Sequence, residues 1–217
     1  MMTSLFMSFD PMTSTMQMNW IMILTPLIIT PKPFWIKKSR MTMMFKMIEK
    51  KMISEMKNIT NKKEMLIMST SFFFTILMMN MMGLFPYIFT PTSHLCISMS
   101  MAMPIWMTMM LYGWINFTNK MFMHLLPTGT PTPIMPMMII IETTGNIIRP
   151  ISLSVRLTAN MIAGHLLMTL LGDINQIKTI MMIMPMQITL TMFESAISMI
   201  QAYVFCTLMT LYSSEIP

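Results

Sequence analysis

Long apolar runs separated by short polar segments set the pattern of this chain of 217 residues. Five of the runs reach or exceed the roughly 20 residues that a helix needs to cross the hydrocarbon core of a bilayer. The pattern predicts an all-α integral membrane protein with about five membrane-embedded helices in a single membrane domain. The runs cover residues 16–36, 65–89, 95–115, 134–171 and 186–213.

Residues 41–63 follow a different pattern, typical of a helix that lies on a membrane surface. Apolar residues recur at spacings of three and four between Met41 and Ile59, and lysines fall beside that stripe. This periodicity predicts a basic amphipathic surface helix. Lysine and arginine outnumber acidic residues ten to three between positions 32 and 64. Because segments rich in lysine and arginine stay on the inner side of a membrane, this one marks the inner side.

The last two apolar runs are too long to stand upright in a bilayer. At 1.5 Å per residue, residues 134–171 form a helix of roughly 57 Å and residues 186–213 one of roughly 42 Å. The hydrocarbon core is only about 30 Å thick. We therefore expect a long, tilted C-terminal hairpin with a turn over 172–185, in which the first helix is steeply tilted, bent at Pro150, or both.

The hairpin predicts which polar residues face each other. With the turn centred midway between Gly172 and Pro185, residues whose numbers sum to about 357 lie opposite one another. This register gives three layers: an acid pair at the open end, an arginine with an amide in the middle, and a histidine with a carboxylate toward the turn. The layers are Glu142 with Glu215, Arg156 with Gln201, and His165 with Glu194.

The chemistry of these layers indicates proton movement. An arginine at membrane depth raises the free energy of insertion by about 2.5–3.5 kcal/mol, and it cannot lose its proton to avoid this. Histidine and a partly buried glutamate exchange protons near neutral pH. Protonatable layers on both sides of a fixed cation predict two separate half-channels. The predicted proton-translocation residues are Arg156, His165, Glu194, Gln201, Asn160, Glu142 and Glu215, where Asn160 shares a helix face with Arg156.

Structural explanations of the same residues stay open, because buried polar pairs also fix helix packing in lipid. The two carboxylates of the open-end layer are expected to resist being ionised together, which suits a proton-release site. Glu215 is also explained by simple solvation near the C-terminus. Arg149 lies seven residues from Glu142 and is expected either to snorkel to the interface or to neutralise Glu142, rather than to act directly.

Several other functions are disfavoured by the sequence. Cys96 and Cys206 lie far apart in apolar runs, which predicts free buried thiols and no metal or disulfide framework. No nucleophile–base set is present, so we expect no catalytic, metal or cofactor residues. The basic segment is flanked by spans, which argues against nucleic-acid binding. His124, in the polar connector 116–133, is interpreted as a loop histidine. We expect no signal or transit peptide, and 39 methionines indicate an organelle genome.

Four stretches resemble one known family, the a subunit of F-type ATP synthase in its mitochondrial form. They are MGLFPYIFTPTSHL from Met81, HLLPTGTPTPIMP from His124, SLSVRLTANMIAGHLL from Ser152 and FESAISMIQAYVF from Phe193. The resemblance implies a multi-pass protein of the mitochondrial inner membrane. It also implies a non-catalytic channel subunit, which contacts a rotating ring of c subunits and other membrane-sector and peripheral-stalk subunits.

The resemblance assigns roles to individual residues. Arg156 stands for the family's essential arginine, which faces the carboxylate of the ring, and Gln201 stands for the nearby amide. Bacterial members usually have an acid where this chain has His165 and a histidine where it has Glu194. Because the exchange keeps a histidine–glutamate pair, it supports the predicted proximity of the two.

One alternative function and one topology follow. A proton-coupled, antiporter-like subunit of a respiratory complex is the alternative, and it predicts lysine and glutamate midway along broken helices in inverted repeats. Neither repeats nor a mid-membrane lysine are found in the sequence. For the topology, the basic segment faces the matrix, the N-terminus faces the intermembrane space, and five crossings leave the C-terminus in the matrix.

Overall fold

The structure is a computed structural model of the whole chain, and it describes residues 5–13, 16–31, 37, 39–60, 62–85, 88–126, 131, 133–173 and 180–215. The secondary structure in these ranges is helical, which confirms the all-α class. In chain order the elements are η1 (Leu5–Phe9), η2 (Met18–Leu24), α1 (Thr25–Ile29), α2 (Arg40–Ile59), α3 (Lys63–Gly83), η3 (Pro91–Ser93), α4 (Leu95–Asn116), α5 (Thr118–Leu125), α6 (Met135–Asp173) and α7 (Ile180–Glu215).

Four of these helices, α3, α4, α6 and α7, are long and apolar enough to cross a membrane. The first predicted span is shorter than its sequence pattern indicates. In place of one helix over 16–36, the 3-10 helix η2 leads into the five-residue α1. Pro26 opens α1 and Pro31 follows its end, and proline removes a helical N–H and disfavours helix at the residue before it. Residues 32–36 lie outside the described part of the chain.

Other boundaries also differ from the predicted ones. α3 ends at Gly83 rather than at 89, since glycine weakens a helix and a proline follows at 86. α7 begins at Ile180 rather than at 186, so that Pro185 lies inside the helix. The connector 116–133 contains a further short helix, α5. His124 lies on α5, but its side chain is outside the described atoms.

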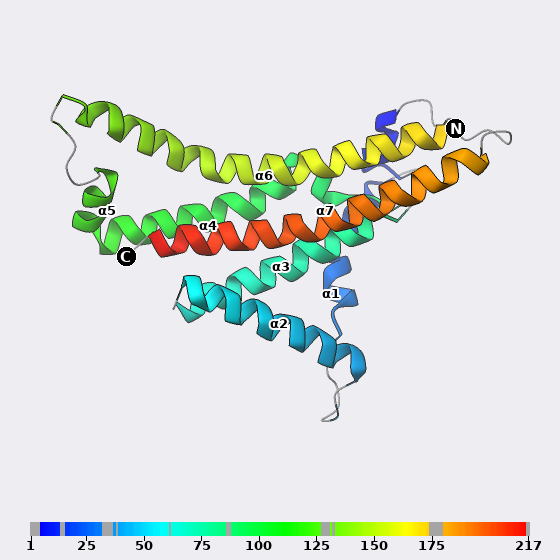
Figure 1. Cartoon of the computed structure of the whole chain (residues 1–217), viewed down its shortest axis with the longest axis horizontal. Coiled ribbons are helices and arrows are strands. Elements are labelled where there is room, and N and C mark those ends of the chain that lie inside the picture. Colours follow the sequence, from blue (N-terminus) through cyan, green and yellow to red (C-terminus); the bar gives the residue numbers. More distant parts are fainter. Residues whose placement is uncertain are drawn as a thin grey trace.

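The long C-terminal hairpin is confirmed. α6 has 39 residues and α7 has 36, well beyond the roughly 20 of an upright span. The two helices run side by side, and α6 is curved (Figure 1). Pro150 lies inside α6, and a proline within a helix is a common cause of bending. α4 packs along α6 and α3 packs along α7, so the hairpin rests on a second helical layer.

The core forms where these helices meet. Ile76 of α3, Leu157 of α6 and Phe205 of α7 are almost completely buried in it. The amphipathic α2 packs against the outside of α3 and α7. Its Met56 is buried, and the Thr210 hydroxyl of α7 donates to the Met56 sulfur at 3.3 Å. The polar and apolar side chains on the other face of α2 are exposed, as in a helix at a membrane surface.

Candidate functional site

The middle of the hairpin is held by an amide pair. The Asn160 side chain donates from Nδ2 to Oε1 of Gln201 at 3.1 Å, and Gln201 is buried. The sequence register instead paired Gln201 with Arg156, which lies one helical turn before Asn160. The predicted middle layer is therefore present, but Gln201 contacts Asn160, one helical turn after the predicted partner Arg156.

Arg156 points away from the rest of the chain. Its side chain is exposed, and it makes no hydrogen bond or ion pair with any residue in the described ranges. Its immediate neighbours on this face are the small residues Ser152 and Ala159, which are exposed as well. The opposite face of α6 is buried through Leu153 and Leu157. A fixed cation beside small side chains on an outward face of an apolar helix is available to a partner outside this chain.

The end of the hairpin nearest the turn has a partly open cavity of about 240 Å³, which His165 and Glu194 line. His165 Nε2 and Glu194 Oε1 are buried, and neither has a hydrogen-bond partner in the described part of the chain. Gly164 makes room for the carboxylate, because a Cβ atom there would lie 3.1 Å from Glu194 Oε1. The cavity is large enough for several waters at about 10–15 Å³ each, so water can link the two groups.

Two polar residues beside this layer were missed by the sequence reasoning. Asn80 of α3 is completely buried, and neither atom of its amide has a protein partner within the described residues. It lies one turn before Gly83, whose backbone contacts the His165 ring. Thr92 of η3 is also completely buried with an unpartnered hydroxyl, and η3 packs against α6. A lone amide in the apolar run 65–89 was the signal for Asn80.

The N-terminal segment packs on this same end. The Phe9 ring meets the His165 ring edge-on, with centroids 6.1 Å apart. His94, which precedes α4, places its Nε2 atom 3.1 Å from the Phe9 carbonyl oxygen. Trp20 and Phe89 stack around the His94 ring. The residues near position 9 therefore lie at the turn end of the hairpin.

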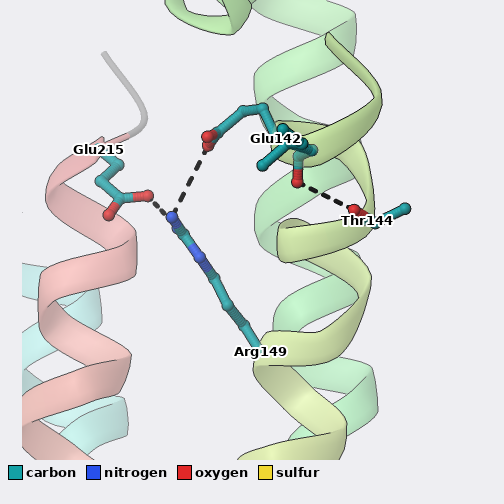
Figure 2. Close-up of polar contacts among 5 residues, drawn as sticks. Glu142, Thr144, Arg149 and Glu215 are labelled. Atoms are coloured by element: carbon teal, nitrogen blue, oxygen red, sulfur yellow. Dashed lines mark hydrogen bonds and ion pairs between the residues drawn. The ribbon is translucent and has the colours of Figure 1, made fainter. Parts of the chain in front are cut away.

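At the open end, Arg149 stands between two carboxylates (Figure 2). Its Nη2 atom lies 3.7 Å from Glu142 Oε1, and its Nη1 atom donates to Glu215 Oε2. The guanidinium also lies 4.9 Å from the centre of the Tyr212 ring. The expected neutralisation of Glu142 by Arg149 is confirmed. The expectation of two carboxylates facing each other directly is wrong, because the long Arg149 side chain reaches the gap between them.

A second, smaller cavity of about 40 Å³ opens beside this ion cluster. Glu142, Arg149 and Glu215 line it, together with apolar side chains from α4 and α5. On α6 this cavity reaches as far as Arg149, whereas the cavity near the turn starts at Asn160. Arg156 lies between the two limits. The hairpin thus has one cavity at each end, and the lining of neither cavity includes Arg156.

The sequence also led to predictions about metal ligands and thiols. No group of three histidine, cysteine, aspartate or glutamate side chains there is arranged to hold a metal ion. Cys96 is exposed, and Cys206 is buried with its thiol donating to the Ser69 carbonyl at 3.1 Å. The exposed Cys96 differs from the predicted buried thiol.

Known proteins resemble the chain over its whole length. The family described as "ATP synthase A chain" matches residues 11–214. Proteins named ATP synthase subunit a from Locusta migratoria, Aedes albopictus and Drosophila melanogaster are each 47% identical to it. Each of these alignments covers 100% of both chains.

Proposed function

Because this chain belongs to the ATP synthase A-chain family, we propose that it conducts protons through two half-channels that meet at Arg156. Membership places it in the membrane sector of ATP synthase, as a multi-pass membrane protein that works with other subunits of that enzyme. The single observation that carries the proposal is the pair of cavities, one at each end of the α6–α7 hairpin, with Arg156 between them.

The first half-channel is the cavity near the turn. A proton enters past His165 and Glu194, two groups that bind and release protons, and water in the cavity connects them. The unpartnered amide of Asn80, one turn before Gly83, offers a further donor and acceptor near His165. Asn160 lines the inner end of this cavity and binds Gln201. The proton therefore arrives one helical turn from Arg156.

The second half-channel is the open end, with Glu142 and Glu215. Between the two half-channels the proton travels on a carboxylate of the c-subunit ring. The exposed Arg156 side chain meets that carboxylate and holds it ionised, since a charge-assisted contact with a guanidinium stabilises the charged form. Arg156 itself cannot pass a proton on, so it prevents direct leakage between the two cavities.

We place the protein in the mitochondrial inner membrane, with the open end of the hairpin toward the matrix. The basic segment ends beside this open end, where the Lys62 ammonium lies 5.9 Å from the centre of the Tyr112 ring near the end of α4. Segments rich in lysine and arginine stay on the inner side. The turn end, with His165 and Glu194, then faces the intermembrane space.

Replacement of Arg156 tests the proposal. In assembled enzyme in sealed vesicles, Arg156→Ala should abolish proton-driven ATP synthesis and ATP-driven proton pumping. Arg156→Lys should fail nearly as completely, because an ammonium lacks the planar fork and releases its proton more readily when buried. Arg40→Ala, which removes an exposed arginine at the start of α2, is the matched control and should pump normally. Near-normal synthesis by the Lys variant would refute the barrier role.

A further inference from the structure

Polar side chains join the two arms of the hairpin at three levels. Toward the turn, the Glu194 carboxylate packs on Gly164, and in the middle Asn160 binds Gln201. At the open end the link is the ion pair of Arg149 with Glu215. Apart from these levels, α6 packs chiefly on α4 and α7 packs chiefly on α3. The last turn of α7 thus depends on Arg149 for its attachment to α6.

Arg149 is more buried than its two carboxylate partners. Its side chain is 28% exposed, whereas the side chains of Glu142 and Glu215 are 41% and 42% exposed. One face of the guanidinium lies over the Tyr212 ring, which favours a cation. The rest of the cavity wall is Asn146 of α6 and five apolar side chains of α4 and α5: Trp106, Met109, Met110, Met121 and Leu125. Apolar walls reduce the screening that weakens ion pairs in open water.

We propose that Arg149 is a positioning residue of the open-end half-channel, where it clamps the end of α7 to α6 and keeps the Glu142 and Glu215 carboxylates apart on either side of one guanidinium. The role rests on the proposed function. It goes beyond neutralisation of Glu142, because Arg149 also attaches the end of α7 to α6. Arg149 further controls the charge of the Glu142 and Glu215 carboxylates at the open end.

The consequence for proton release follows from the charges. The titratable groups that line this cavity are Glu142, Arg149, Tyr212 and Glu215. Two adjacent carboxylates without a cation resist being ionised together and retain a proton between them. In the native protein the guanidinium contacts both carboxylates and supplies the opposite charge between them. The cluster then passes protons toward the matrix without storing them.

The test uses four forms of the assembled enzyme in vesicles whose inner and outer pH are set independently. They are the native protein, Arg149→Gln, Glu215→Gln and the double variant. Arg149→Gln should slow synthesis several-fold and move the matrix-side pH profile upward by about one unit, the shift that a neighbouring opposite charge typically produces. The double variant should recover part of the rate, since only one carboxylate remains, so the two changes should be non-additive.

Two further variants serve as controls. Arg149→Lys keeps the cation and should restore most of the rate and the pH profile. Lys120→Gln removes a cation of α5 that lies over the Phe117 ring, outside the cavity lining, and should change neither. If Arg149→Gln prevents assembly, the exchange Arg149→Glu with Glu215→Arg should restore assembly by reversing the pair. Failure of that exchange would overturn the clamp.

Other results separate this proposal from the proposed function. Additive effects of Arg149→Gln and Glu215→Gln, or a native rate and pH profile in Arg149→Gln, overturn the role of Arg149 and leave the half-channels untouched. A shift of only the intermembrane-side profile overturns the assignment of this cavity to the matrix half-channel. Active proton pumping by Arg156→Ala, measured in the same vesicles, refutes the proposed function itself.

Discussion

At the scale of single residues, the absence of one side chain sets the position of Glu194. Gly164 of α6 faces this carboxylate so closely that an added Cβ atom would lie 3.0 Å from its Cδ atom and 3.3 Å from its Cγ atom. Ordinary contacts to a Cβ atom are longer. A side chain at 164 would therefore push the carboxylate away from α6 and from the cavity that it shares with His165.

Gly164→Ala should slow proton transport without loss of assembly. Alanine stabilises a helix interior by about 0.5–1 kcal/mol relative to glycine, so the substitution should not destabilise α6 itself. Gly145→Ala is the matched control, since a Cβ atom at this position of the same helix meets nothing within 4 Å. ATP-driven proton pumping by both variants, normalised to assembled enzyme, measures the difference. Equal rates for the two alanines would show that the close packing at 164 has no role in transport.

Residue types and helical spacing could be recognised from the sequence, but contacts between helices could not. Arg156 was identified because a fixed charge in an apolar run has few explanations, and Asn160 because it lies on the same face. Asn80 was missed because its position beside the His165 layer depends on the packing of η3 against α3 and α6. These elements come together only in the folded chain. The position of Arg149 between two carboxylates was likewise hidden, because the reach of a long side chain is not visible in numbering alone.

At the scale of helices, the observed pairing of residues between α6 and α7 can be compared with the pairing predicted from residue numbers. The three contacts between α6 and α7 join residues whose numbers sum to 358, 361 and 364, against the expected value near 357. Side chains on a helix point toward its N-terminus, so in an antiparallel pair the contacting tips come from residues with larger numbers. The offset is smallest at Gly164, which has no side chain, and largest for Arg149 with Glu215.

The attachment of α2 depends on a few buried methionines. Met56→Ala should destabilise the protein by about 2–5 kcal/mol, the range for large-to-small changes at buried sites, because Met56 is 1% exposed and contacts Thr210 of α7. Met47→Ala is the control on the same helix, since Met47 is 67% exposed. Thermal unfolding in detergent should separate the two variants. Equal midpoints would mean that α2 does not pack on α7 as described.

At the scale of the whole molecule, the number of crossings fixes which ends share a side. Four helices of the described chain are long enough to span the membrane, and all four follow the basic segment. An even number of crossings returns the chain to the side from which α3 started. If all four helices cross, the C-terminus lies on the same side as the basic segment, whether or not the shorter η2–α1 segment crosses. Only the side of the N-terminus depends on that segment.

The packing of the N-terminal segment decides this remaining question. Phe9 lies against His165 and His94 at the turn end of the hairpin, whereas Glu215 and Lys62 lie at the open end. In the proposed topology the two ends of the hairpin face opposite sides of the membrane. That topology requires the chain to pass from one side to the other between Phe9 and α2, where the described helices η2 and α1 are short.

Epitope tags at the two ends therefore make a paired test of the topology in mitoplasts, in which the outer membrane is removed and the inner membrane is intact. Added protease should cleave an N-terminal tag and leave a C-terminal tag untouched until detergent opens the membrane. Each tag is the control for the other. Cleavage of the C-terminal tag in intact mitoplasts would reverse the orientation and place the His165 cavity on the matrix side. Protection of both tags would instead show that the N-terminal segment does not cross, and that its contacts with His165 form from within the membrane.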